Sequence, residues 1–383
     1  MKNTRRLAAL VYRKWLLSGG EIQSMLPDGE GRQFVQDIVY TAVRRRRAIR
    51  FALDMFVKQW PKGELESLLV VGAAQILYME SVPDFAAVSE TVDAAKRCEN
   101  SSVAKVVNGV LRNLIRRRAE VESRLAAAPL AVRESFPDAL VKRWERDFGP
   151  ENAAAICIAF NRPADNFIAA KDGTFRKLEH GRKVQDEPGF ADGAFIVQDP
   201  ATRHAVELLD IQPGERILDA CAAPGGKSIQ IAWRGAELAA CEVNPKRRRR
   251  LEENLARTKL SDKVQIAGSL DSLPDGSFDK VLVDAPCSNT GVMRRRADAR
   301  WNWSAKKVAE LVALQREILA KAAAKCRRGG IVVYSTCSID KEENEAQVKA
   351  FIASHPGAAL SAERSSLPFA SDDDGAYAAA LRV

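Results

Sequence analysis

The chain has 383 residues, 46% of them hydrophobic and 28% charged, with a net charge of +9. This length exceeds one ordinary hydrophobic core, so we expect two or three domains. No apolar run approaches the roughly 18 residues of a membrane span, and charged residues interrupt the N-terminal segment where a secretory signal would be apolar, so we expect a cytoplasmic protein. The seven scattered cysteines argue against a disulfide framework or a zinc ribbon.

Positive charge is concentrated in the N-terminal part of the chain. Residues 1–150 carry 25 Lys and Arg against 18 Asp and Glu, whereas the remainder carries 34 against 32. The runs RRRR at 44–47 and RRR at 116–118 are denser than solubility requires, although charge runs are more often solvated faces than binding sites. The distribution indicates a polyanionic partner, RNA or DNA, bound through its phosphates.

The first 145 residues show helical patterns only. Apolar residues recur at three- and four-residue spacing in 64–80 and again in 101–118. We therefore expect an all-α domain over 1–145. Residues 146–205 consist of short segments punctuated by Pro and Gly, which indicates a small mixed connector domain.

Residues 206–383 change to short β-branched runs that alternate with helical stretches. The runs lie at 216–220, 237–243, 264–268, 280–285 and 331–337, and the tail at 376–383 is expected to form a last edge strand. This alternation predicts an α/β, Rossmann-like domain with a mostly parallel, doubly wound sheet. Ligands of such sheets bind beyond the carboxyl ends of the strands, so the residues after each run are the candidates for function.

The motif CAAPGGK at 221–227 follows the first of these strands and precedes a helix. Its glycines allow close approach of a nucleotide-like ligand, but the spacing is neither GxGxxG nor GxxxxGK[ST], which favours a ligand without a pyrophosphate. Glu242 closes the next strand, where a carboxylate can accept hydrogen bonds from both ribose hydroxyls. S-adenosylmethionine meets both conditions; a tight turn beside an exposed glutamate is the alternative.

Single cysteines follow two later strands, Cys287 in DAPC and Cys337 in STCS. Carbon 5 of cytosine is a poor nucleophile, and addition of a thiolate to carbon 6 makes it reactive. Asp284 is placed to stabilise that adduct at the N3 and amino edge of the pyrimidine. A base must then remove the proton from carbon 5, so two cysteines are usable, one to attack and one to assist release.

The two strands are expected to be neighbours, so both thiols should open into one crevice. The alternatives are two buried structural thiols, a disulfide, or a metal site; we predict no metal, because none of the three histidines is near these motifs. An attacking cysteine should sit in a site that lowers its pKa, such as a helix N-terminus, and Ser338 and Asp340 are cap candidates for a helix after Cys337.

The segment MRRRADARWNW at 293–303 interleaves arginines with Trp301 and Trp303. Arginine for phosphates and tryptophan for base stacking suit single-stranded RNA, although the tryptophans could equally belong to a core.

Together, the glycine motif, DAPCS and STCS resemble the Nol/Nop/Sun family of RNA (cytosine-5)-methyltransferases. The segments VGAAQILYMESVPDFAAVSETVDAAK and VVNGVLRNLIRRR resemble the NusB-like RNA-binding domain of the bacterial branch of that family, whose substrate is small-subunit ribosomal RNA. The resemblance implies that Cys337 is the nucleophile, that Cys287 assists product release, and that ribosomal RNA is the substrate, with transfer RNA as the alternative. It also implies contacts to S-adenosylmethionine or the target base from Cys221, Ala222, Ala223, Pro224, Gly225, Gly226, Lys227, Glu242 and Asp284.

The sequence departs from the family after its third strand. Members usually have an acidic residue that touches the adenine, whereas here Ser269 takes that position and Asp271 follows two residues on. We expect Ser269 to be a cofactor contact and the protein to be a monomer. A non-catalytic RNA-binding assembly factor of the same fold is the competing interpretation, and the presence of Cys287, Cys337 and Asp284 weighs against it.

Overall fold

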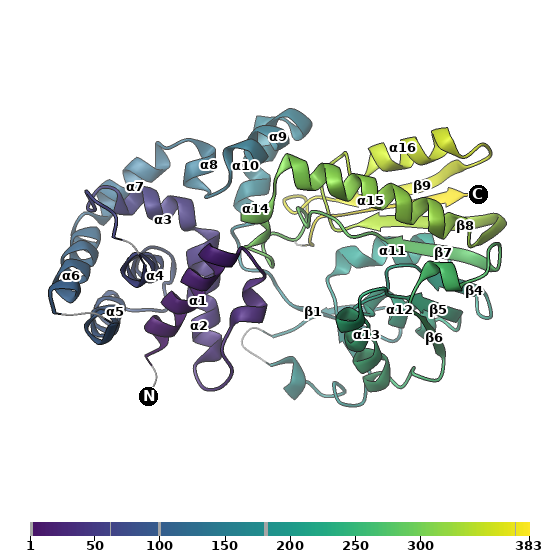
Figure 1. Cartoon of the computed structure of the whole chain (residues 1–383), viewed down its shortest axis with the longest axis horizontal. Helices are drawn as coiled ribbons and strands as arrows, with labels where there is room; N and C mark the ends of the chain where they lie inside the picture. The colour runs from purple at the N-terminus through teal and green to yellow at the C-terminus, as the bar shows by residue number, and fades with distance from the viewer. Residues whose placement is uncertain (1–2, 62, 99–100, 180–182, 372) are drawn as a thin grey trace. The chain divides into compact units, whose positions relative to one another are not determined.

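The computed structural model describes residues 3–61, 63–98, 101–179, 183–371 and 373–383. The chain divides into two compact units, shown in Figure 1. Unit 1 comprises Met1–Asn161 and Arg296–Asn302, and unit 2 comprises Arg162–Arg295 and Trp303–Val383. Among the described residues, no helix is both long and apolar enough to cross a lipid bilayer.

Unit 1 is helical, which confirms the all-α prediction for the N-terminal part. Its central helix is α4, apolar around most of its circumference and buried from Ser67 to Ile76, as expected for a helix enclosed by others. The helices are α1 (Thr4–Ser18), α2 (Arg32–Arg44), α3 (Arg46–Leu53), α4 (Glu64–Tyr78), α5 (Asp84–Cys98), α6 (Ser101–Arg116), α7 (Arg118–Ala126), α8 (Leu130–Arg133), α9 (Asp138–Phe148), α10 (Pro150–Ala159) and α14 (Ala299–Asn302), with the 3-10 turn η1 (Ile22–Met25).

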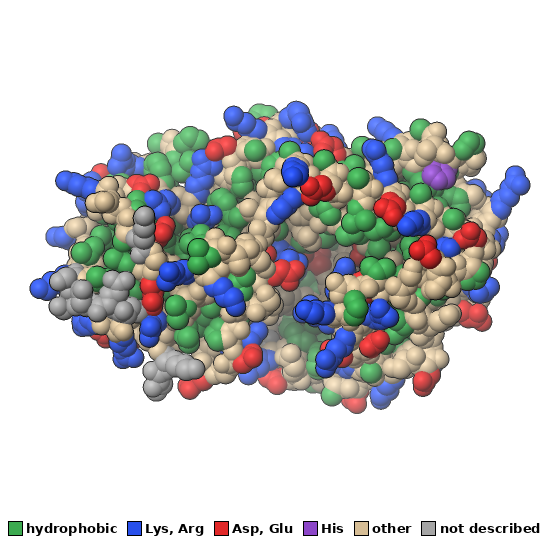
Figure 2. Space-filling view, viewed as in Figure 1, with side chains coloured by type: hydrophobic (Ala, Val, Ile, Leu, Met, Phe, Trp, Pro, Cys, Tyr) green, Lys and Arg blue, Asp and Glu red, His purple; other side chains and the backbone are tan. Residues whose placement is uncertain are grey.

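The RRRR run is largely built into this unit. Arg45 pairs with Glu134 at 3.3 Å, Arg47 pairs with Asp138 at 2.8 Å, and Arg46 lies over the ring of Trp15. Arg45 and Arg47 thus link the start of α3 to the end of α8 and to α9, and Arg46 contacts α1, so the density of the run does not by itself mark a phosphate-binding face. Figure 2 shows Lys and Arg side chains spread over the visible face and interspersed with acidic ones.

Unit 2 begins with a small antiparallel sheet in the order β2-β1-β3. Its strands are β1 (Phe167–Ala170), β2 (Phe175–Lys177) and β3 (Phe195–Val197), with the 3-10 turns η2 (Val184–Asp186) and η3 (Pro200–Thr202). The segment 146–205 therefore contributes α10 to unit 1 and this sheet to unit 2. Its status as a separate connector domain remains a prediction.

The larger sheet of unit 2 has seven strands in the order β6-β5-β4-β7-β8-β10-β9. All neighbours from β6 to β8 are parallel, whereas β10 is antiparallel to β8 and to β9, which confirms the predicted mostly parallel α/β domain. The strands are β4 (Arg216–Asp219), β5 (Glu237–Cys241), β6 (Val264–Ala267), β7 (Phe278–Asp284), β8 (Cys326–Thr336), β9 (Ala359–Ser366) and β10 (Ala376–Arg382), and the 3-10 turn η4 (Leu270–Ser272) follows β6.

Helices cover both faces of this sheet (Figure 1). On one face α11 (Arg203–Leu208), α12 (Gly226–Trp233) and α13 (Pro245–Arg257) form a core with Ile217, Leu238 and Leu282. On the other face α15 (Ala305–Ala323) and α16 (Glu345–Ser354) form a core with Val281 and Val332. The expected edge position of the tail is wrong, because β10 lies inside the sheet and β9 forms the edge.

Candidate active site

The two cysteine-bearing loops lie side by side because their strands are neighbours. Strand β7 pairs in parallel with β8, and Asp284 stands opposite Ser335 at the carboxyl ends. Cys287 and Cys337 follow within three residues, and their Sγ atoms are 3.2 Å apart. Both cysteines are free and, taken as whole residues, partly exposed, and Cys337 Sγ lies 3.4 Å from Asn289 Oδ1. The structure therefore brings the two thiols together, as the sequence predicted.

The Cys287 thiol is held in its protonated form. The hydrogen bond to Cys337, together with burial and the nearby Cys337 sulfur and Glu343 carboxylate, raises the pKa of Cys287 well above its usual range. Two thiolates at this distance would repel each other strongly, so the pair holds at most one negative charge near neutral pH. A protonated Cys287 can donate its hydrogen to a thiolate at Cys337.

A close backbone contact fixes the loop after Cys287. Gly291 N donates to the Cys337 carbonyl at 2.9 Å, and Gly291 O accepts from Gly375 N at 2.8 Å. A Cβ atom on Gly291 would stand 2.1 Å from the Gly375 carbonyl oxygen. Only glycine fits between these two backbones, so the position of Cys337 relative to this loop depends on Gly291.

Asp284 is held by two side chains. Lys227 Nζ lies 2.7 Å from Asp284 Oδ2, and Ser335 Oγ donates to Asp284 Oδ1 at 2.9 Å. Burial alone would lower the pKa of Lys227, but the charge of Asp284 and its hydrogen bond, with a further contribution from Cys337, raise it. Lys227 therefore carries an ammonium ion that fixes the Asp284 carboxylate.

The CAAPGGK turn is anchored by a residue that precedes it, Asp219. This buried carboxyl group accepts a hydrogen bond from Ser228 Oγ at 2.6 Å and another from Cys221 N at 3.3 Å. Gly225 has φ +108° and caps α12, and a Cβ there would meet a Leu251 methyl carbon at 2.8 Å. Burial raises the pKa of the Cys221 thiol, so this cysteine is a neutral packing residue.

Glu242 lies at the end of β5, as predicted. Its carboxylate accepts from Asn244 N at 2.8 Å and lies 3.5 Å from Arg247 Nε, while Arg247 also donates to the Ala223 carbonyl at 2.8 Å. Arg247 thus ties Glu242 to the glycine turn. An acidic side chain and a glycine turn at adjacent strand ends form a donor and acceptor set that fits the ribose and amino-acid ends of S-adenosylmethionine.

Ser269 follows β6, the next strand along the sheet. Its hydroxyl accepts from Asp271 N at 3.1 Å and its carbonyl accepts from Ser272 Oγ at 2.7 Å, so the residue caps the short turn η4. Ser269 and Asp271 therefore form one local unit at the carboxyl end of the sheet.

The predicted helix start after Cys337 is wrong. Helix α16 begins at Glu345, with Asn344 preceding it, so neither Ser338 nor Asp340 caps it. Ser338 Oγ instead accepts from Asp340 N at 3.0 Å within a tight turn. The Ser and Asp that signal a helix start in the sequence form this turn.

The RNA-binding interpretation of MRRRADARWNW is wrong for Arg294 and Arg300, because both side chains are buried. Arg294 pairs with Asp374 at 2.6 Å in unit 2, and Arg300 donates to Asn161 Oδ1 at 3.0 Å in unit 1. Trp301 packs on the core of unit 1, which agrees with the alternative interpretation that the tryptophans belong to a core.

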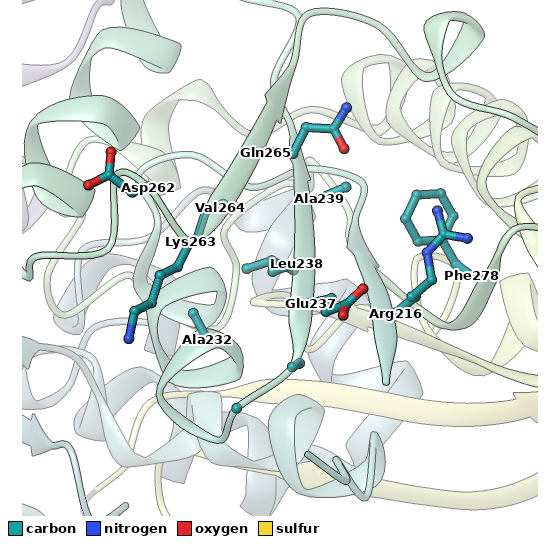
Figure 3. Close-up of a pocket in the computed structure, with 12 residues that line it drawn as sticks. Arg216, Ala232, Glu237, Leu238, Ala239, Asp262, Lys263, Val264, Gln265 and Phe278 are labelled. Atoms are coloured by element: carbon teal, nitrogen blue, oxygen red, sulfur yellow. The ribbon is translucent and has the colours of Figure 1, made fainter. Parts of the chain in front are cut away.

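A cavity of about 620 Å³ lies at the amino ends of strands β4, β5 and β6, whereas the cysteines follow the carboxyl ends of β7 and β8. Figure 3 shows Arg216, Glu237 and Lys263 around it. Its described lining residues include no cysteine. The cysteine chemistry is therefore separate from this cavity.

Two residues of the site were not anticipated. Asp219 is the last residue of β4, just as Asp284 is the last residue of β7. This shared position at a strand end could have identified Asp219 from the sequence. Glu343 is fully buried between the two cysteine loops, accepting from Ser288 N at 2.9 Å and Ser338 Oγ at 2.6 Å. No sequence pattern marks Glu343 in the same way, because its hydrogen-bond partners are brought to it only when the turn folds.

The sheet and the glycine turn after β4 define the class, an S-adenosylmethionine-dependent methyltransferase. Residues 206–381 match the family described as 16S rRNA methyltransferase RsmB/F, and residues 2–116 match the NusB family. This chain belongs to the RsmB/F family, as the resemblance in the sequence predicted, and it is an RNA methyltransferase that uses S-adenosylmethionine.

Relatives that align over their full length support this family assignment, and solved structures support the fold. Ribosomal RNA small subunit methyltransferase B of Serratia proteamaculans is 32% identical over 99% of this chain and 98% of its own length. The protein of that name from Yersinia enterocolitica is 31% identical over 100% and 99%. The crystal structure of PH0851 covers 100% of this chain and 98% of its own at TM-score 0.80 and 21% identity. The structure of NSun6 from Pyrococcus horikoshii with SFG covers 65% and 98% at TM-score 0.57 and 20% identity, and both structures bear on the fold.

Proposed function

We propose that this protein methylates carbon 5 of a cytosine in small-subunit ribosomal RNA through a covalent adduct between Cys337 and carbon 6. One observation carries the proposal: the free thiols of two partly exposed cysteine residues lie 3.2 Å apart at the carboxyl ends of neighbouring strands. A methyltransferase acting on an exocyclic amine or a ribose hydroxyl has no need for a thiol pair. The names of the full-length relatives support ribosomal RNA as the substrate.

Cys337 attacks as a thiolate. Its sulfur bonds to carbon 6, and the electron pair of the 5,6 double bond moves so that carbon 5 becomes nucleophilic. The Cys287 thiol, which keeps its proton, stabilises the Cys337 thiolate by donating to it before attack. The Asp284 carboxylate, fixed by Lys227 and Ser335, can accept a hydrogen bond from the cytosine amino group. S-adenosylmethionine, when bound, supplies the electrophilic methyl group that carbon 5 takes up.

Release requires loss of the proton from carbon 5 and departure of the Cys337 sulfur. Once Cys337 is bonded to carbon 6, its sulfur is a neutral thioether. The hydrogen bond and the charge of Cys337 that raised the pKa of Cys287 are then gone, so the Cys287 thiol loses its proton to solvent more readily than in the resting enzyme. The Cys287 thiolate can therefore accept the carbon 5 proton. The electron pair of that carbon–hydrogen bond reforms the 5,6 double bond, and the Cys337 sulfur leaves as a thiolate.

The cofactor-binding residues proposed from the sequence keep their assignment. The backbone of Cys221 to Lys227 would hold the amino-acid end and Glu242 the ribose, with Ser269 near the adenine. The turn geometry at Gly225 and the placement of Glu242 and Ser269 at adjacent strand ends support this assignment. Asp284 would face both the cofactor and the target base.

Transfer RNA is the second candidate substrate, because the same catalytic residues could serve it. The NusB-family match over residues 2–116 favours an RNA-binding role for unit 1. The monomeric state, the cytoplasmic location and the three-part division of the chain stay predictions.

Tritium release tests the proposal. RNA labelled with tritium at carbon 5 of cytosine loses the label to water when that carbon is methylated, and the release that requires S-adenosylmethionine reports methylation. We expect release from small-subunit ribosomal RNA and, after bisulfite sequencing, one resistant cytosine. Release only from transfer RNA would exclude the ribosomal substrate. Binding of ribosomal RNA with no release from either RNA would favour a non-catalytic assembly factor.

A further inference from the structure

We propose that Glu343 is a positioning residue that sets the separation of the two active-site thiols. Its effect on turnover rests on the proposed function, whereas its effect on the geometry of the thiol pair does not. Glu343 lies six residues after Cys337, in the turn before α16, and its side chain is fully buried.

The first half of the bridge holds the loop of Cys287. Ser288, the next residue in the chain, donates its backbone N–H to Glu343 Oε1 at 2.9 Å. The Ser288 hydroxyl also bonds to Glu343 Oε2. A backbone and a side-chain donor of one residue thus converge on one carboxylate, which fixes both the position and the rotation of the peptide unit after Cys287.

The second half holds the loop of Cys337. Ser338 follows Cys337 directly, and its Oγ donates to Glu343 Oε2 at 2.6 Å. The two serine hydroxyls also lie 3.3 Å from each other. Each of the two serines bound to the carboxylate is therefore the chain neighbour of one catalytic thiol, so a shift of Glu343 changes the distance between the sulfurs.

The bridge is anchored from outside the two loops. Gln315 of α15 donates Nε2 to Glu343 Oε1 at 2.9 Å and also to the Pro286 carbonyl at 3.0 Å. Tyr334 of β8 donates its hydroxyl to the Glu343 carbonyl oxygen at 2.7 Å. Helix, strand and turn thus hold one side chain in place, as positioning to within fractions of an ångström requires.

The donor pattern also predicts how substitutions behave. A carboxylate can accept all four side-chain and backbone bonds, and alanine accepts none. In Glu343→Gln the amide oxygen can keep the bonds from Ser288 N and Gln315, and the amide nitrogen can donate to the two serine hydroxyls, because hydroxyls also accept. Glutamine should therefore preserve the bridge, and alanine should break it.

A trivalent arsenical measures the thiol separation without any methyl transfer. Phenylarsine oxide condenses with two thiols, forming two arsenic–sulfur bonds and releasing one water, and it binds tightly only when both sulfurs reach one arsenic atom. We expect stoichiometric binding to the full-length chain, absent in Cys287→Ala. The second arsenic–sulfur bond forms only if the second thiol has a high effective concentration near the bound arsenic. We therefore expect Glu343→Ala to bind the arsenical at least about tenfold more weakly, and Glu343→Gln to bind it like the natural chain.

Kinetics provide the second readout. We expect Glu343→Ala to lower kcat by about 100-fold through misplaced thiols, with little change in KM for S-adenosylmethionine, and Glu343→Gln to restore most of it. Gln347→Ala is the matched control, because Gln347 is equally buried and bonds to Gln315 at 3.0 Å but to neither cysteine loop. It should leave arsenical binding unchanged.

Equal arsenical binding by Glu343→Ala and the natural chain would overturn the proposal, whatever the activities. If Glu343→Ala does not fold, the double variant Ser288→Ala/Ser338→Ala removes both serine hydroxyls and keeps Glu343; unchanged binding there would overturn it equally. If the natural chain binds the arsenical but methylates no cytosine, the proposed function fails and the positioning role stands.

Discussion

Cys287 Sγ and Cys337 Sγ lie 3.2 Å apart although 50 residues separate them in the chain. The parallel pairing of β7 and β8 brings their loops together, and the Glu343 carboxylate joins the two loops. The two thiols are not equivalent, since Cys287 holds its proton more tightly than an ordinary cysteine. Removing one or the other should therefore arrest the reaction at different steps.

Cys337→Ala should abolish methylation. Without the sulfur no adduct forms at carbon 6, and we expect kcat to fall by at least about 10³-fold, as when other covalent nucleophiles are removed. Binding of S-adenosylmethionine should be nearly unchanged, because the glycine turn and Glu242 are untouched. Tritium release and isothermal titration calorimetry measure the two quantities. Full activity in this variant would show that Cys337 is not the nucleophile.

Cys287→Ala should trap a covalent complex with RNA. Attack and methyl transfer remain possible, but removal of the carbon 5 proton loses its base, so the adduct accumulates. A protein–RNA band that survives denaturing electrophoresis is the expected observation. Cys326→Ala is the control, because Cys326 begins β8 and Cys337 follows its far end. Turnover at the natural rate with no such band would contradict the role of Cys287 in release.

The sheet and the pairing of the two thiols could be predicted from sequence because both follow from local patterns. Short β-branched runs alternating with helices specify a parallel sheet, and parallel neighbours bring their carboxyl ends to one edge. Placing Cys287 beside Cys337 needed nothing further. Strand β9 escaped prediction because it is an exposed edge strand whose side chains show no apolar alternation.

The polar scaffold could not be predicted, because its partners are distant in the chain and its signals are ambiguous. Arg295 binds Asp199 and Asp374, which lie 96 and 79 residues away. Arginines beside tryptophans look the same in sequence whether they face RNA or a buried carboxylate. Likewise Ser338 and Asp340 have the composition of a helix cap, and only the folded turn shows that Glu343 takes up the Ser338 hydroxyl.

Asp219 should make unit 2 less stable as the pH rises from about 4 to about 6. Burial raises the pKa of Asp219 to about 6. An aspartate in the unfolded chain has a pKa of about 3.9, so folding favours the protonated form of Asp219. The contribution of Asp219 to the free energy of unfolding is fully present below the pKa of the unfolded chain. It is lost as the pH rises through the pKa of the folded protein.

Asp219→Asn removes this dependence and can keep the bonds to Ser228 and Cys221. The free energy of unfolding of the variant, relative to the natural chain, should rise by roughly 3 kcal/mol between pH 4 and pH 7, from a shift of about two units. Urea unfolding at several pH values measures it. Parallel stability curves for the two proteins would show that Asp219 has the same pKa in the folded and the unfolded chain.

Asp374→Ala should destabilise unit 2 strongly. Asp374 accepts from Arg294 at 2.6 Å and from Arg295 at 2.5 Å, and its side chain is only 3% exposed. Removal leaves two largely buried guanidinium groups with one remaining carboxylate, Asp199, so we expect a loss of about 3–5 kcal/mol. Glu317→Ala, which breaks the exposed pair with Lys321, should cost less than about 1 kcal/mol. Thermal unfolding compares the two variants, and equal losses would mean that Arg294 and Arg295 are not held by this buried cluster.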